Sequence, residues 1–181
     1  RTAGIPTVAT RVAHVGGADG AASILSLTKS GAYTQILSGI CGYTGATTVT
    51  AGVLKAGSAS GFSSASNYIV NGGTLDAGGL NVSLASLAGV GGTVDVGAGS
   101  ISTNGSNTST QYGGALAGTG TLVKAGTGQL TLNGGGLFSG MIDVQAGSLR
   151  STTLSGLPSG ANLNLSGLGT VFALGATQGV A

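Results

Sequence analysis

The sequence has 181 residues, enough for one domain, with 41% hydrophobic residues, 6% charged residues and a formal net charge of +2. Disorder driven by charge is excluded, because such chains combine low hydropathy with high charge. The six cations are scattered along the sequence and form no basic patch for nucleic acid. The 38 glycines lose much backbone entropy on folding, so the chain needs a repeated, cooperative source of stability.

Residues 1–23 do not share the pattern of the rest of the chain. Their apolar residues have the spacing of a helical face that ends at two glycines: Ile5, Val8, Val12 and Val15. The stretch from residue 8 to residue 12 would fit a strand equally well. We predict that residues 1–23 are an N-terminal cap or docking arm, as helix or as strand, and that residues 24–181 form a separate repeat region.

A long internal repeat begins at Leu27. A shift of 95 positions lays residues 27–55 on residues 122–150 without a gap, and ten of the 29 positions are identical. Residue character is also kept at several pairs: Lys29 and Lys124, Leu37 and Leu132, Tyr43 and Phe138, Val49 and Val144, Leu54 and Leu149, Lys55 and Arg150. The match continues from 60–72 to 155–167, and then one residue out of step, so that Asp76 falls on Phe172. The region therefore holds one unit of about 95 residues and part of a second.

A shorter period lies inside the unit. Val49, Gly52, Leu54 and Gly57 recur 21 residues later, and the pattern around Leu75 recurs 19 residues later around Val94. Periods of about 20 residues indicate a solenoid. Each repeat contains a few alternating residues bounded by glycines, which predicts short strands joined by tight turns, with no helix.

The strands and their spacing predict an all-β parallel β-helix of about nine rungs, with a core about 40 Å long. Positions that stay apolar across the shifts are expected to point inward: Leu37, Val49, Leu54, Leu75, Val94, Leu130, Leu132, Val144 and Leu149. Truncating such a residue, as in Leu132→Ala, should be costly. Lys29, Lys124, Lys55 and Arg150 are expected to be outward charges that keep the rod soluble, so Lys124→Ala should cost little.

The motif in the second copy is more specific than its glycine content. It runs from Lys124 through Gly126, Gly128, Leu130, Leu132 and Gly134 to Phe138 and Gly140, and ends with Val144, Ala146, Gly147 and Leu149. This pattern resembles the passenger-associated transport repeat of autotransporter passengers. The resemblance implies a right-handed β-helix, secretion by a Gram-negative cell and export through an outer-membrane translocator barrel. The first copy departs from the pattern at Tyr33 and Gln35, where a bulge is expected.

Candidate catalytic residues are few. Asp76 and Asp95 should stack one rung apart on the same face, and pectin-cleaving β-helices use carboxylates on adjacent coils. Because we expect no Arg, Lys or His at an equivalent nearby strand position, we interpret them as solvated surface and predict no catalysis. His14 lies in the arm, without another ligand at metal spacing, and is interpreted as a surface or packing residue. No catalytic, cofactor-binding or metal site is predicted.

Other motifs also favour structural interpretations. Leu75 stands where the calcium-binding nonapeptide needs glycine, and the glycine-rich runs lack phosphate-loop spacing. Cys41, the single cysteine, cannot form a disulfide within the chain and is expected to be buried. The aromatic residues of the repeat region are expected to pack in the core or at corners: Tyr33, Tyr43, Phe62, Tyr68, Phe138 and Phe172.

The sequence and the resemblance together predict a non-enzymatic, structural or adhesive β-helical segment of a secreted or surface-displayed passenger. A self-assembling extracellular filament subunit is the first alternative, and a carbohydrate-active β-helix enzyme is a weaker one. The expected partners are the translocator barrel, further repeats or other copies of the chain joined end to end, and a host or neighbouring cell surface. No cofactor is expected.

Overall fold

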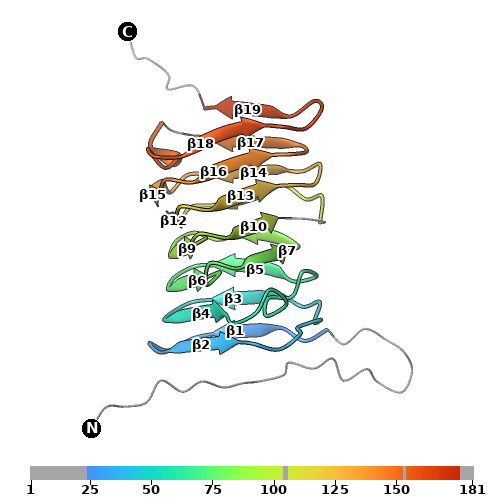
Figure 1. Cartoon of the computed structure of the whole chain (residues 1–181), viewed down its shortest axis with the longest axis vertical. Helices are drawn as coiled ribbons and strands as arrows, with labels where there is room; N and C mark the ends of the chain where they lie inside the picture. The colour runs from blue at the N-terminus through green and yellow to red at the C-terminus, as the bar shows by residue number, and fades with distance from the viewer. Residues whose placement is uncertain (1–23, 104–105, 153, 176–181) are drawn as a thin grey trace.

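The chain forms a parallel β-helix, described in this computed structural model for residues 24–103, 106–152 and 154–175. Figure 1 shows the strands stacked as rungs, from β1 and β2 at the N-terminal end to β19 at the other. The predicted fold class is confirmed, with about seven turns in place of about nine. Nine rungs would need about 20 residues each over the whole sequence, whereas the described strands span residues 27–174. The predicted arm, residues 1–23, lies outside the described residues.

The described strands line three faces of the solenoid, called A, B and C in chain order. Face A contains β1 (Leu27–Lys29), β3 (Thr47–Val49), β5 (Asn67–Val70), β8 (Ser86–Ala88), β11 (Thr110–Tyr112), β14 (Gln129–Leu132), β17 (Ser148–Ser151) and β19 (Val171–Leu174). Face B contains β2 (Thr34–Leu37), β4 (Val53–Ala56), β6 (Thr74–Asp76), β9 (Thr93–Asp95), β12 (Ala115–Gly118) and β15 (Gly136–Phe138). Face C contains β7 (Asn81–Leu84), β10 (Ser100–Thr103), β13 (Thr121–Lys124), β16 (Met141–Val144) and β18 (Asn162–Leu165).

Face A is continuous along the rod although its strands form two sheets. The sheets meet between β8 and β11, where Gly89 bridges Tyr112 and accepts a hydrogen bond from the amide of Gly113. Corners without a strand replace face C in the first two turns, at residues 38–46 and 57–66. In the seventh turn a corner with a short 3-10 helix, Leu154–Gly156, replaces face B. None of the helical segments among the described residues is long and apolar enough to cross a membrane.

The core runs along the axis because alternate residues of each short strand point inward. All nine residues predicted to point inward are buried, with at most 2% of their surface exposed. Each inward residue stacks on the like position of the next coil, as Leu54 does on Leu75 and Leu75 on Val94. The predicted burial of the repeating apolar positions is therefore confirmed.

Glycine is required where one corner stacks closely on the next. Gly52 and Gly73 both have a φ of +64°, in the left-handed region that other residues rarely adopt. A Cβ on Gly73 would lie 2.5 Å from the carbonyl oxygen of Gly52, one coil below. These glycines therefore permit both the turn and the close approach of successive corners.

The two copies of the long repeat do not lie on the same faces. The first begins with β1 on face A and β2 on face B, whereas the second begins with β13 on face C and β14 on face A. The strandless corner at residues 57–66 on face C has its counterpart on face B, at residues 152 and 154–161, whereas the counterpart of residues 38–46 contains β15. One unit of 95 residues thus spans four turns and two of the three faces of a fifth.

Strand pairing corrects two details of the sequence alignment. Leu54 pairs with Leu75, and its counterpart Leu149 pairs with Phe172, so Phe172 is equivalent to Leu75 and not to Asp76. The corner before β19 is longer than the corner before β6, which moves the register. The bulge expected at Gln35 is absent from the described chain, because β2 pairs with β4 without interruption from Thr34 to Leu37.

Candidate functional sites on the rod

The first corner of each long repeat encloses a lysine side chain. The Lys29 ammonium donates hydrogen bonds to the carbonyl oxygens of Ser30 at 3.1 Å, Gly31 at 2.8 Å and Ala51 at 3.0 Å. Two acceptors belong to the lysine's own corner, and the third belongs to the corner of the next coil. The lysine therefore connects two successive coils.

Lys124 repeats this arrangement on other faces. Its ammonium donates to the carbonyls of Ala125 at 2.9 Å, Gly126 at 2.8 Å and Ala146 at 3.3 Å, at the same sequence offsets as in the first copy. Burial lowers the pKa of Lys124, since the charged form loses solvation. We call the two sites the lysine clamps.

The lysine clamps overturn the interpretation of these lysines as outward charges. Lys29 is 8% exposed and Lys124 is 5% exposed. The sequence does indicate that these lysines point inward. Lys29 lies two residues after Leu27 and Lys124 two residues after Leu122, and residues two apart in a strand point to the same side. The prediction that Lys124→Ala costs little does not fit this burial.

The acidic pair lies as predicted, with Asp76 on β6 beside Asp95 on β9. The sequence interpretation missed Lys55, which is the strand partner of Asp76 on the other side and forms an ion pair with it at 2.6 Å. The other oxygen of Asp76 accepts a hydrogen bond from the amide of Gly78. Asp95 accepts a hydrogen bond from the amide of Gly97 at 2.8 Å. Both carboxylates thus hold a turn, and one of them is also neutralised by a cation.

Asp143 has a carboxylate held in place by three hydrogen bonds, and the sequence analysis did not single it out. It lies on β16, is 8% exposed and accepts hydrogen bonds from Gln145 at 2.8 Å, Asn164 at 2.9 Å and Ser166 at 2.7 Å. The bond from Ser166, supported by those from Gln145 and Asn164, holds the pKa of Asp143 below its ordinary value of 3.8. The site links β16 to β18 on the outside of face C.

The remaining residues considered in the sequence analysis are buried in the core, lie at corners, or lie outside the described residues. Cys41 is buried, as expected, and borders a cavity of about 310 Å³ on the side of the first turns. Most of the predicted aromatic residues are in the core, Phe172 is partly buried, and Tyr33 is exposed at its corner. His14 lies outside the described residues. The described residues contain no cluster of three or more potential metal ligands.

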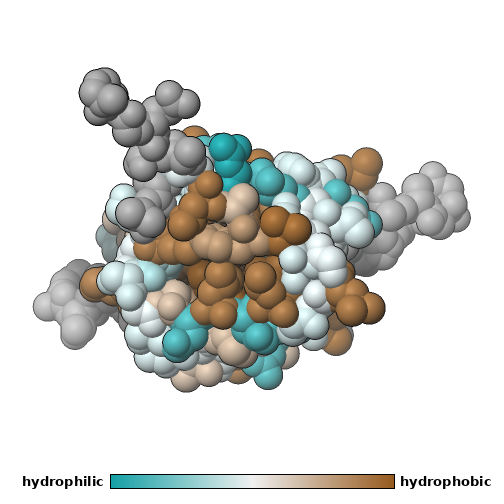
Figure 2. All heavy atoms as spheres, turned by 90° about the horizontal axis from the view of Figure 1, so that it is seen from above, coloured by the Kyte–Doolittle hydropathy of each residue, from teal (hydrophilic) through white to brown (hydrophobic). Residues whose placement is uncertain are grey.

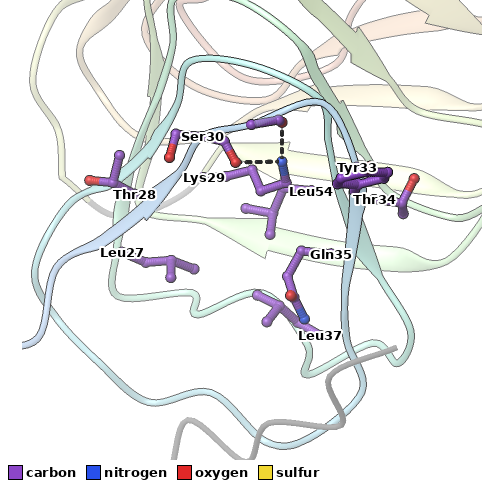
Figure 3. A pocket seen from close by; sticks show the side chains of 10 residues that line it. Leu27, Thr28, Lys29, Ser30, Tyr33, Thr34, Gln35, Leu37 and Leu54 are labelled. Atoms are coloured by element: carbon purple, nitrogen blue, oxygen red, sulfur yellow. Dashed lines mark hydrogen bonds between the residues drawn. The ribbon is translucent and has the colours of Figure 1, made fainter. Parts of the chain in front are cut away.

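The N-terminal end of the described rod is hollow. A cavity of about 340 Å³ opens inside the first coil, where Leu27, Gln35 and Leu37 face one another (Figure 3). Gln35 occupies an inward position that Leu54 fills in the next coil. Lys29 borders the same cavity, with its ammonium bonded to the corner (Figure 3).

The opposite end is apolar and exposed. Figure 2 looks onto it, and hydrophobic side chains gather at its centre. Three leucines at inward positions of β18 and β19 are at least 39% exposed: Leu163, Leu165 and Leu174. We call this surface the C-terminal stacking face.

Comparison with known families assigns the long repeat. The model of the passenger-associated transport repeat matches residues 27–56 and 122–150. These segments contain both lysine clamps, and they coincide with the two copies found by self-alignment. The predicted resemblance to autotransporter passengers is confirmed.

A curated relative also matches. The chain is 37% identical over 92 residues to a protein named adhesin BmaC autotransporter, from Brucella suis biovar 1 (strain 1330). The match covers 50% of this chain and 3% of the length of that protein. No solved structure matches significantly.

Proposed function

We propose that this segment of an autotransporter passenger, a protein secreted or displayed at the cell surface, serves as a non-enzymatic adhesive rod. The observation that carries the proposal is the match to an autotransporter named as an adhesin. The fold supports it, because a stack of parallel coils presents long, regular outer surfaces on which a partner can bind. The partners we propose are a host or neighbouring cell surface and, for export, an outer-membrane translocator domain.

The chemistry of the outer surface supports adhesion that does not depend on salt. The sequence carries only ten charged side chains, two of its six cations form the lysine clamps, and Lys55 is paired with Asp76. Electrostatic attraction therefore contributes little to binding, and polar and apolar contacts dominate.

Adhesion is tested with beads that carry the purified chain, and binding to cultured host cells and to bacteria is counted at low and high salt. We expect coated beads to bind more than uncoated beads, with little change when salt is raised. The control is the variant Leu75→Asp, which places a charge in the core and removes the folded surface. Equal binding by coated and uncoated beads would refute the adhesive function.

The absence of catalysis is part of the proposal and rests on the acidic pair. One oxygen of the Asp76 carboxylate is paired with Lys55 and the other accepts a hydrogen bond from the amide of Gly78, so neither oxygen is free to act on a substrate. Incubation of the chain with pectin and related polysaccharides should release no reducing sugar. Release that is lost in Asp95→Asn would establish the enzyme alternative.

Self-assembly into a filament is the second candidate, favoured by the exposed leucines of the C-terminal stacking face. Sedimentation at rising protein concentration tests it. A monomer at every concentration contradicts the filament and leaves the adhesive rod unaffected.

A further inference from the structure

The C-terminal stacking face has a covered counterpart within the same chain. Leu163 and Leu165 of β18 correspond to Tyr68 and Val70 of β5, because each pair follows the same strand of the repeat by the same spacing. The two residues of β18 are 39% and 46% exposed, whereas both residues of β5 are 0% exposed. The difference comes from what lies above each strand.

The same holds for the neighbouring strand. Leu174 of β19 corresponds to Ala77, which follows β6, and the two are 50% and 0% exposed. In the first unit β8 pairs with β5 and β9 pairs with β6. In the second unit β18 and β19 each have one strand partner among the described residues.

We propose that the C-terminal stacking face binds a further coil with the inward pattern of residues 78–97. This coil is the one that covers the equivalent surface in the first unit. Its inward side chains are buried to 2% exposure or less: Val82, Leu84, Leu87, Val94 and Val96. The inference does not depend on adhesion, because it concerns how the rod is extended.

The rotation between the two units fixes where the added strands lie. In the first unit β7 lies on face C, above the strandless corner of residues 57–66, and the amide of Ala85 bonds to Ser66. The corresponding corner of the second unit is on face B. The added coil therefore begins on face B, pairs next with β18 on face C, and then pairs with β19 on face A.

The first coil of a second copy fits this surface less well. That coil presents Gln35 at an inward position and surrounds a cavity of about 340 Å³. Docking it onto the leucines would enclose unfilled space, which is unfavourable because the side chains lining that space lose packing contacts. A coil with leucine and valine at every inward strand position avoids this cost.

The proposal is tested by inserting a second copy of residues 78–97 between Leu174 and Gly175 in the full chain. Amide hydrogen exchange in β18 and β19 should slow at least tenfold, while exchange in β5 and β6 stays unchanged. The matched control carries Val82→Ser, Leu87→Ser and Val94→Ser in the inserted copy alone. Exchange in β18 and β19 that is unchanged by the insertion, or slowed equally by the control, overturns the proposal.

A second measurement covers an insertion that fails to fold. A synthetic peptide of residues 78–97 is added to the intact chain, and slower exchange confined to β18 and β19 is expected. Protection of β1 and β2 together with β18 and β19, rising with the concentration of the chain alone, would show that a second copy occupies the face. That result overturns the proposal.

Discussion

The two transport repeats show how one sequence pattern can be used at two places in a solenoid. Both copies bury the same leucines and valines and both form a lysine clamp, although the second is turned onto other faces. The environment of a residue is set by the coils directly above and below it, and not by the face on which it lies. The copies differ where those neighbours differ, at the first described coil, which borders a cavity, and around the aromatic position.

The largest difference is expected from leucine truncation in the two copies. Leu132 is enclosed between coils, so Leu132→Ala should lower the free energy of unfolding by about 2 to 5 kcal/mol. Leu37, its counterpart, borders the N-terminal cavity, so Leu37→Ala should cost less. Urea unfolding measures both, with exposed Leu137→Ala as a control that changes stability by about 0.5 kcal/mol or less. Equal losses in the two copies would contradict the hollow first coil.

The lysine clamps are expected to give the next largest effect. Lys124→Met keeps the aliphatic stem but leaves three carbonyls without their charged donor, and should cost about 2 kcal/mol. Lys29→Met should cost less, because water can reach its corner from the cavity. Exposed Arg150→Met is the control, with a change within about 0.5 kcal/mol. A loss no larger than the control's would show that the three hydrogen bonds of Lys124 add no net stability.

The aromatic residue of the repeat is a tyrosine in the first copy and a phenylalanine in the second, so only the first copy has a hydroxyl group there. The Tyr43 hydroxyl forms a hydrogen bond with the Thr47 hydroxyl at 2.7 Å, and the Thr47 hydroxyl forms another with Ser66. All three groups are buried, whereas the counterpart of Tyr43, Phe138, packs against Gly140. Tyr43→Phe should cost about 1 kcal/mol in thermal or urea unfolding. Tyr68→Phe is the control, because the Tyr68 hydroxyl is the buried side-chain group without a hydrogen bond among the described residues. The control should leave stability unchanged or raise it.

The smallest expected effect is a loss of stability at low pH, and it should appear in the second copy alone. Asp143 corresponds to Thr48 in the first copy, which has no charge. Because the folded-state pKa of Asp143 lies below its unfolded value, its stabilisation is present above about pH 4 and is lost as the pH falls through the folded pKa. Ser166→Ala should cost about 1 kcal/mol at pH 7 and less at pH 2.5.

Hydrogen exchange locates this effect. Lowering the pH should weaken protection of β16 and β18 more than that of β3 and β5, after correction for intrinsic exchange rates. Equal weakening in both copies would assign the acid response to the whole rod.

The sequence was sufficient for the features that repeat. Leu54, Leu75 and Val94 recur at a spacing of one coil, so their stacking and the β-helix could be predicted. The faces could not be predicted, because 95 residues is not a whole number of turns and the corners vary in length, as before Phe172. The lysine clamps were missed because charge suggests exposure, and only the coil above Lys124 supplies the third carbonyl. Likewise, Lys55 and Asp76 are 21 residues apart in the sequence, and only the register of β4 on β6 makes them neighbours.

The offset between units determines in which directions equivalent side chains would point around the axis of an autotransporter rod built from several such units. Each unit advances the rod by roughly 22 Å at the usual spacing between strands. Because each unit stops one face short of five full turns, equivalent side chains of successive units follow a screw around the rod. Three units return them to their starting face. Contacts that recur in every unit would therefore point in all directions around the axis, and a weak contact could be used many times whichever side the rod turns to a surface.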